Sequence, residues 1–116
     1  MAADRREIGR AAEDAAVAYL ESQGLEIVTR NFRRRLGELD IVARERDTLI
    51  IVEVRKRTSN RFGGAAASVD FRKQVKLQRA AAQLLQQRPD LRQMRVRFDV
   101  VAITPTGIDW IKHAFT

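Results

Sequence analysis

The sequence predicts a single α/β domain in which a mixed central sheet is flanked by helices. Two segments carry apolar residues at helical spacing, and five are rich in β-branched residues, in the order helix, three strands, helix, two strands. At 116 residues the chain is long enough for one hydrophobic core but not for two. We therefore expect one domain over residues 1–116, with an antiparallel meander first and a crossover helix before the fourth strand.

The first helix is predicted from about Asp4 to Gln23, and Gly24 is its stop signal. Glu13 lies at the margin of the apolar face of this helix. It is therefore either a surface acid that pairs within the helix or a functional acid that binds a metal or orients a water. The residues expected on the apolar face are Ile8, Ala12, Ala15, Ala16 and Tyr19.

A short strand is predicted over residues 25–29, followed by a basic loop over residues 30–35. The planar fork of arginine matches phosphate oxygens, and a basic loop just before an acidic hairpin is well placed to contact a nucleic-acid backbone. The alternative is an ordinary solvated loop. The candidates for phosphate contact in this segment are Arg30, Arg33, Arg34 and Arg35.

The next two strands, residues 37–43 and 49–57, form a predicted hairpin that carries the candidate site. If residues 46–47 are the two turn residues, Asp40 lies directly opposite Glu53. Directly opposite residues have Cβ atoms roughly 4.5–5.5 Å apart, so two carboxylates in this arrangement repel each other. Some positive charge must offset that repulsion.

The acidic pair predicts a site for a hard divalent cation. The alternation of a strand should place Glu38, Asp40, Glu53 and Arg55 on one face of the sheet. Mg²⁺ prefers oxygen ligands and is often held by one or two carboxylates together with phosphate oxygens, which is the setting of phosphodiester chemistry. The alternative is a solvated sheet edge with ordinary ion pairs, but the apolar run at residues 50–52 indicates a buried strand, where an acid carries a desolvation cost.

A loop is predicted over residues 58–68, and a second helix begins near Ser68 or Asp70 and runs to about Gln87. Its expected buried stripe comprises Val69, Leu77, Ala80, Ala81, Leu84 and Leu85.

Lys73 extends this stripe, so its side chain should point towards the sheet, either as a functional cation or as a stem that covers apolar surface. Arg72 and Lys76 fall on another side of the helix. Together with Arg61 in the preceding loop, they are further candidates for contact with a nucleic-acid backbone.

Residues 94–103 and 108–112 are the last predicted strands. Asp99 lies inside the first of them, and we interpret it as a structural acid that is satisfied by nearby donors. His113 stands alone and is expected to be neither a ligand nor a base.

The composition favours a polyanionic partner. Lys and Arg number 22 against 15 Asp and Glu, which gives a net charge of +7. A charge of this size points to nucleic acid, although it also serves solubility. Without cysteine there is no disulfide, zinc ribbon or thiol nucleophile. No signal peptide or membrane span is recognisable, so we expect a cytoplasmic protein with no membrane partner.

Several motifs, in sequence order, resemble those of the YraN family of small bacterial predicted endonucleases, within the PD-(D/E)XK nuclease superfamily. The resemblance covers about residues 9–115. The motifs are GELD at residues 37–40, VEVR at 52–55, FGGA at 62–65, KQVKL at 73–77 and FDVV at 98–101.

This resemblance implies a restriction-endonuclease-like fold with an αβββαβ core, related to archaeal Holliday junction resolvases. It also implies that Asp40 and Glu53 are ligands for Mg²⁺ or Mn²⁺ and that Glu13 is a further acidic member of the site. Because junction resolvases act in pairs, a homodimer is suggested by analogy.

The superfamily pattern places lysine two residues after the second acid, where this chain has Arg55. Arginine stays charged and can only orient or stabilise, whereas lysine can share a proton with an attacking water. Lys73 is the candidate for the missing lysine.

The leading hypothesis is a Mg²⁺-dependent nuclease that acts on DNA, with branched or otherwise structured DNA as the expected substrate. Asp40 and Glu53 would hold the metal, and Arg55 with Lys73 would stabilise charge on the phosphate. The second hypothesis is a nucleic-acid-binding protein with a degenerate nuclease site and no turnover. The third is an adaptor whose basic face binds an acidic protein.

Overall fold

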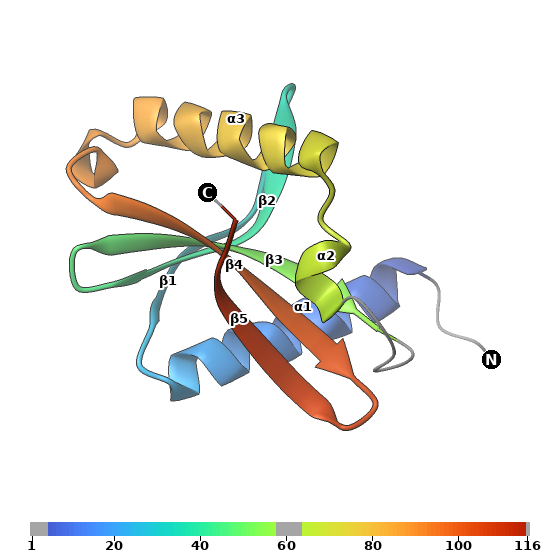
Figure 1. The fold of residues 1–116 in the computed structure, drawn as a ribbon. Helices are drawn as coiled ribbons and strands as arrows, with labels where there is room; N and C mark the ends of the chain where they lie inside the picture. The colour runs from blue at the N-terminus through green and yellow to red at the C-terminus, as the bar shows by residue number, and fades with distance from the viewer. Residues whose placement is uncertain (1–4, 58–63, 116) are drawn as a thin grey trace.

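The structure is a computed structural model that describes residues 5–57 and 64–115, and it contains a five-stranded sheet with helices on both faces (Figure 1). The predicted order of helix, three strands, helix and two strands is confirmed, with a short helix and a 3₁₀ turn as additions. The elements are α1 (Arg5–Ser22), β1 (Glu26–Arg34), β2 (Gly37–Glu45), β3 (Thr48–Lys56), α2 (Gly64–Ala67), α3 (Phe71–Gln87), η1 (Pro89–Leu91), β4 (Arg95–Thr104) and β5 (Gly107–Phe115).

The sheet is mixed, and its strand order is β1-β2-β3-β4-β5. The first three strands are antiparallel neighbours, β3 and β4 run parallel, and β5 is antiparallel to β4. The predicted meander and crossover are therefore confirmed, because a parallel pair requires a long connection and α3 lies within it.

Each face of the sheet carries one apolar cluster. On one face, α3 packs Leu77 and Leu84 into a cluster that includes Ile51 of β3. On the other face, α1 packs Leu20 into a cluster that includes Ile50. Strand β3 is thus buried on both sides, as its continuous apolar run predicts.

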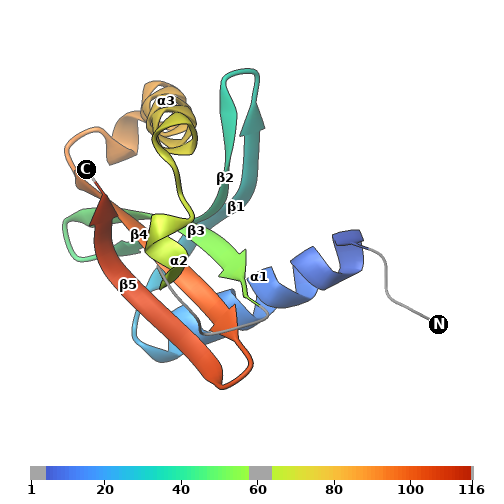
Figure 2. The ribbon, with the colours of Figure 1, turned by 45° about the vertical axis from the view of Figure 1, so that its right-hand side comes forward.

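The apolar face of α1 begins later than predicted. Ala12, Ala16 and Leu20 are buried, whereas Ile8 and Ala15 are exposed. The first turns of α1 extend beyond the strands, so there is no sheet for Ile8 to pack against (Figure 2).

The prediction of a basic loop at residues 30–35 is wrong, because β1 continues to Arg34. Phe32 pairs with Leu39 of β2 and is buried in the cluster beneath α3. The aromatic side chain supplies burial that extends the strand, and residues 35–36 form the turn. The tip of this hairpin rises beside α3 (Figure 2).

Two other boundaries differ from the prediction. Residues 64–67 of the predicted loop form α2, and residues 58–63 lie outside the described residues. Strand β5 continues to Phe115, which pairs with Phe98 and stacks on its ring. Within the described ranges, no helix combines the length and apolarity that crossing a membrane requires.

Candidate functional site

Asp40 and Glu53 meet where the regular pairing of β2 with β3 ends. The predicted register of this hairpin is confirmed, and its last regular pair joins Ile41 to Val52. Beyond it, the carboxylate of Asp40 accepts a hydrogen bond from the backbone N–H of Val54 at 3.0 Å. An acidic side chain thus takes the place of a backbone acceptor, which brings Asp40 against β3 beside Glu53.

Glu53 is buried, and only one of its two carboxylate oxygens has a polar partner among the described residues. Its side chain is 5% exposed, and its Oε2 lies 3.1 Å from Arg55 Nη2 and 3.4 Å from Lys73 Nζ. Its Oε1 is also buried, and no donor among the described residues reaches it. The pKa of Glu53 is raised to about 8, first by burial and then by the hydrogen bond and negative charge of Asp40, while Lys73 and Arg55 act in the opposite direction.

Two carboxylates so close together repel each other, and the raised pKa of Glu53 favours a proton on this acid near neutral pH in the metal-free protein. A divalent cation between the two groups could replace that proton, since it would neutralise both carboxylates and give Glu53 Oε1 a partner. Among the described residues, no group of three or more acids or histidines could hold a metal ion, so the candidate rests on two carboxylates.

The Lys73 side chain points towards the sheet, as predicted. Asp70 caps α3 by accepting a hydrogen bond from the backbone N–H of Lys73 at 2.8 Å, which fixes the first turn of the helix. The Lys73 side chain then contacts Glu53. Arg55, which lies on β3 together with Glu53, contacts the same carboxylate. Two cations from different elements therefore converge on one carboxylate oxygen.

Glu13 approaches the same region from α1. Its side chain is 16% exposed, and its Oε1 lies 3.9 Å from Arg30 Nη2, too far for a hydrogen bond. The pKa of Glu13 is raised by burial and by the negative charge of Asp40, and this is partly offset by Arg30 and by a hydrogen bond with Asn31. Glu13 is thus electrostatically coupled to the acidic pair.

Glu38 is not part of this group, although the strand alternation predicted that it would share a face with Asp40. Leu39 and Val42 pack in the cluster beneath α3, whereas Ile41 packs beneath α1, so β2 does not keep its alternation here. Glu38 is exposed and lies 3.4 Å from Arg33 instead.

The structure divides the predicted phosphate-binding residues into paired and unpaired groups. Arg30 lies 2.6 Å from Asp14, and Arg33 pairs with Glu38. Arg34 donates to Gln87 at 2.7 Å and covers the ring of Phe32. These arginines hold the β1–β2 hairpin in place, so their guanidinium groups already have partners within the protein and are less available to bind phosphate.

Within the described ranges, Arg35, Arg72 and Lys76 have no ion-pair partner, and Arg61 lies outside them. Arg35 and Lys76 border a shallow groove of about 320 Å³ between the hairpin and α3. We call it the α3 groove; it is lined by residues 33–38 together with Lys73 and Lys76. Lys73, which lines this groove, also contacts Glu53.

We call Glu13, Asp40 and Glu53 the acidic group. A second groove, of about 510 Å³, lies on the side of α1 and has Glu13 among its lining residues, and the sequence interpretation missed its basic residues. Arg6, Arg10 and Glu13 follow one another at a spacing of three to four residues, which places them on one face of the helix, and this spacing could have revealed the site. We call it the α1 groove; it is lined by Arg6, Gly9, Arg10, Glu13, Asn31 and Arg33.

Asp99 is structural, as predicted. It is fully buried, and each of its oxygens accepts two hydrogen bonds. The donors are the guanidinium of Arg97, the indole of Trp110 and the backbone N–H of His113, at 2.8–2.9 Å. His113 contributes its backbone N–H to this network.

Comparison with known proteins assigns the chain to a family. It is 45% identical over 112 residues to a protein of Halorhodospira halophila, covering 97% of this chain and 89% of that protein. It is 51% identical over 109 residues to a protein of Cupriavidus necator (92% and 81%) and 49% identical over 117 residues to one of Xanthomonas campestris (99% and 96%). All three are UPF0102 proteins. Residues 12–103 match the profile described as uncharacterised protein family UPF0102, and the chain therefore belongs to this family.

Proposed function

We propose that this chain is a metal-dependent nuclease that hydrolyses DNA phosphodiester bonds, with branched or otherwise structured DNA among its substrates. The observation that carries the proposal is Glu53: a buried acid with one unsatisfied oxygen, beside a second acid and two cations. A purely structural acid has no need of that arrangement, because its oxygens would be satisfied by donors.

Asp40 and Glu53 would hold Mg²⁺ or Mn²⁺, with substrate phosphate and water completing the coordination. The ion would supply Lewis-acid activation of a water and neutralise charge on the phosphate. The residues fit this role because they offer carboxylate oxygens, the ligand type that these ions prefer, and because Oε1 of Glu53 has no hydrogen-bond partner among the described residues.

The remaining groups would act on the phosphate and the water. Lys73 and Arg55 would stabilise negative charge that builds up on the phosphate oxygens and the leaving oxygen. The guanidinium of Arg55 can orient and stabilise, whereas the amine of Lys73 is also able to share a proton with the attacking water. Glu13, with its raised pKa, is suited to orienting that water or accepting its proton.

The resemblance of the Asp40 and Glu53 motifs to PD-(D/E)XK nucleases, and to the YraN family in particular, supports the same proposal. Arg55 at the usual lysine position favours a second candidate function, a nucleic-acid-binding protein without turnover. In that case Arg55 and Lys73 serve only to neutralise Glu53.

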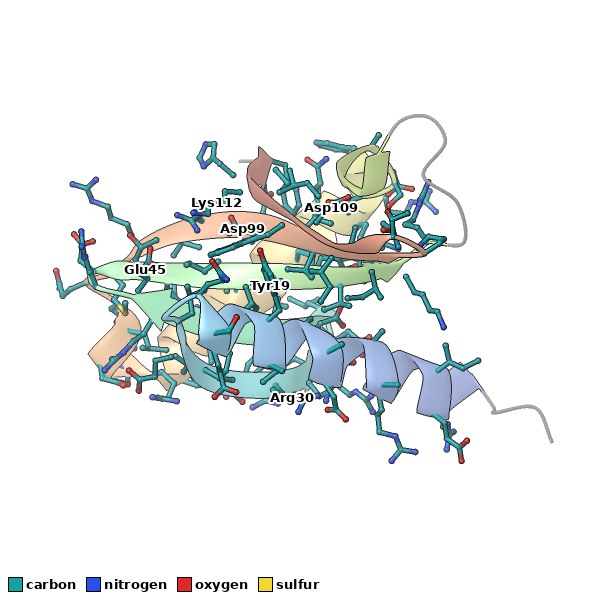
Figure 3. All side chains as sticks on the ribbon, turned by 90° about the horizontal axis from the view of Figure 1, so that it is seen from below. Tyr19, Arg30, Glu45, Asp99, Asp109 and Lys112 are labelled. Carbon is teal, nitrogen blue, oxygen red and sulfur yellow. The ribbon has the colours of Figure 1, made fainter. Side chains whose placement is uncertain are left out.

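The two candidates are separated by a cleavage assay on linear duplex, single-stranded and four-way-junction DNA, with Mg²⁺ or Mn²⁺ and with EDTA. For the nuclease we expect metal-dependent cleavage by the wild type and a loss of at least 100-fold, on the order expected for removal of a reacting-centre group, in Asp40→Asn and Glu53→Gln. The matched control is Glu45→Gln, an acid on β2 at the far end of the sheet, which should cleave like the wild type (Figure 3).

Cleavage that survives Glu53→Gln would mean that the site is wrong. DNA binding without cleavage in any metal, together with unchanged or tighter binding by Asp40→Asn, would favour the non-catalytic candidate.

A further inference from the structure

The α1 groove holds two arginines whose charge no residue in the described part of the chain pairs with. Arg6 and Arg10 line it, and within residues 5–57 and 64–115 neither has an ion pair or a hydrogen bond from its side chain. An exposed guanidinium is no evidence by itself, but two on one helix face, beside a concave surface, form a local field that favours anions.

Gly9 provides an independent observation. It lies inside α1 and lines the same groove. Glycine inside a helix costs roughly 1 kcal/mol relative to alanine, so it needs a reason. Packing against the described residues does not supply one, because a Cβ at Gly9 would meet none of their atoms within 4 Å. The missing side chain instead leaves the backbone of α1 open to close approach by a ligand.

The position of the groove indicates what that ligand is. At one end lies Glu13, which is coupled to Asp40, and at its border lies Arg33, which also lines the α3 groove. The acidic group is thus flanked by two basic grooves that share one arginine. A polyanion that lies across Asp40 and Glu53 has a positively charged surface on both sides.

We propose that the α1 groove is a second binding site for the DNA phosphodiester backbone, and that the bound strand passes from this groove over the acidic group into the α3 groove. This inference rests on the proposed function. It adds Arg6, Gly9 and Arg10 to the binding surface, and it means that the strand continues on both sides of the bond that is cut.

The test is DNA binding by fluorescence anisotropy in EDTA, with fluorescein-labelled single-stranded and duplex oligonucleotides over a range of KCl concentrations. The variant Arg6→Gln/Arg10→Gln should weaken binding on the order of tenfold, and the slope of log K against log salt should fall by about two. The control Arg46→Gln/Arg95→Gln removes the same charge at the turn between β2 and β3 and the adjacent start of β4, and it should retain the wild-type slope.

Gly9→Gln tests the open backbone without a change of charge. Glutamine is a better helix former than glycine, so the variant should be at least as stable as the wild type in thermal unfolding. Its side chain would nevertheless fill the groove, and binding should weaken severalfold. Binding by Gly9→Gln and by Arg6→Gln/Arg10→Gln that equals binding by the control would overturn the inference.

Because the binding assay contains no metal, its result is separate from that of the cleavage assay. A wild type that cleaves DNA while the α1 groove variants bind like the control would overturn this inference and leave the nuclease proposal standing. A wild type that binds through Arg6 and Arg10 but cleaves nothing would overturn the nuclease proposal and leave this binding site standing. A wild type that does not bind DNA at all would overturn both.

Discussion

Two buried acids in neighbouring strands, Asp99 and Glu53, differ in how far their oxygens are satisfied. They are close in the sheet, since Asp99 of β4 is the parallel partner of Val52 and Glu53 is the partner of Val100. Asp99 receives four hydrogen bonds from three donors. Glu53 has two cations on one oxygen and, among residues 5–57 and 64–115, no donor on the other.

The difference teaches that burial alone does not distinguish an acid satisfied by the fold from one that is a candidate for function. Both carboxylates carry the cost of leaving water, and in Asp99 that cost is offset by complementary donors. In Glu53 it is offset incompletely, and burial and Asp40 raise the pKa of this carboxyl to about 8, which favours its protonated form near neutral pH. The oxygen without a partner among the described residues makes Glu53 the candidate for binding a ligand.

The largest effect on stability is expected when Asp99 is changed. Asp99→Asn removes a charge that Arg97 needs and turns an amide N–H₂ towards groups that only donate. Loss of one partner of a buried ion pair costs roughly 3–5 kcal/mol in the free energy of unfolding, measurable by urea denaturation. The control Asp109→Asn, on the exposed part of β5, should stay within about 0.5 kcal/mol of the wild type. A similar loss in both variants would contradict the structural role of Asp99.

Glu53→Gln should increase the free energy of unfolding, whereas Asp99→Asn should decrease it. Because the pKa of Glu53 is raised from 4.5 to about 8, its contribution to stability is fully present below pH 4.5 and is lost as the pH rises through 8. Glutamine does not titrate, so the variant should match the wild type at acidic pH and exceed it by roughly 2–4 kcal/mol above pH 8 in the absence of metal.

This difference is measured by urea denaturation in EDTA across the pH range. If the variant is less stable than the wild type at alkaline pH, the carboxylate of Glu53 has stabilising partners, as that of Asp99 has. The contrast between the two acids would then be wrong.

The smallest effect on stability is expected for Lys73→Met. The Lys73 side chain is 32% exposed, so loss of its contact with Glu53 should cost less than about 1 kcal/mol. Lys73 lowers the pKa of Glu53, so its removal should shift the pH dependence assigned to Glu53 to higher pH. DNA cleavage should fall sharply despite the small change in stability.

The matched control is Arg72→Met, which removes an exposed cation one residue away and should leave the pH dependence of stability unchanged. If both variants shift that pH dependence equally, the effect is one of net charge and not of contact with Glu53.

The sequence alone determined the features that depend on local backbone geometry. The two-residue turn at residues 46–47 sets the register up to the pair of Ile41 with Val52, next to which Asp40 and Glu53 lie. The helical period and the Asp70 cap set the direction of Lys73. These features extend over a few residues, so residue spacing was enough to predict them.

Only the tertiary structure decided which charges are satisfied. Arg34 is held by Gln87 of α3, Asp99 takes two of its donors from β5, and Oε1 of Glu53 receives none among the described residues. The α1 groove likewise needs Arg33 of β1 beside α1. The physical reason is that the free energy of a charged group depends on burial and on partners that are distant in sequence, and spacing along the chain carries no information about either.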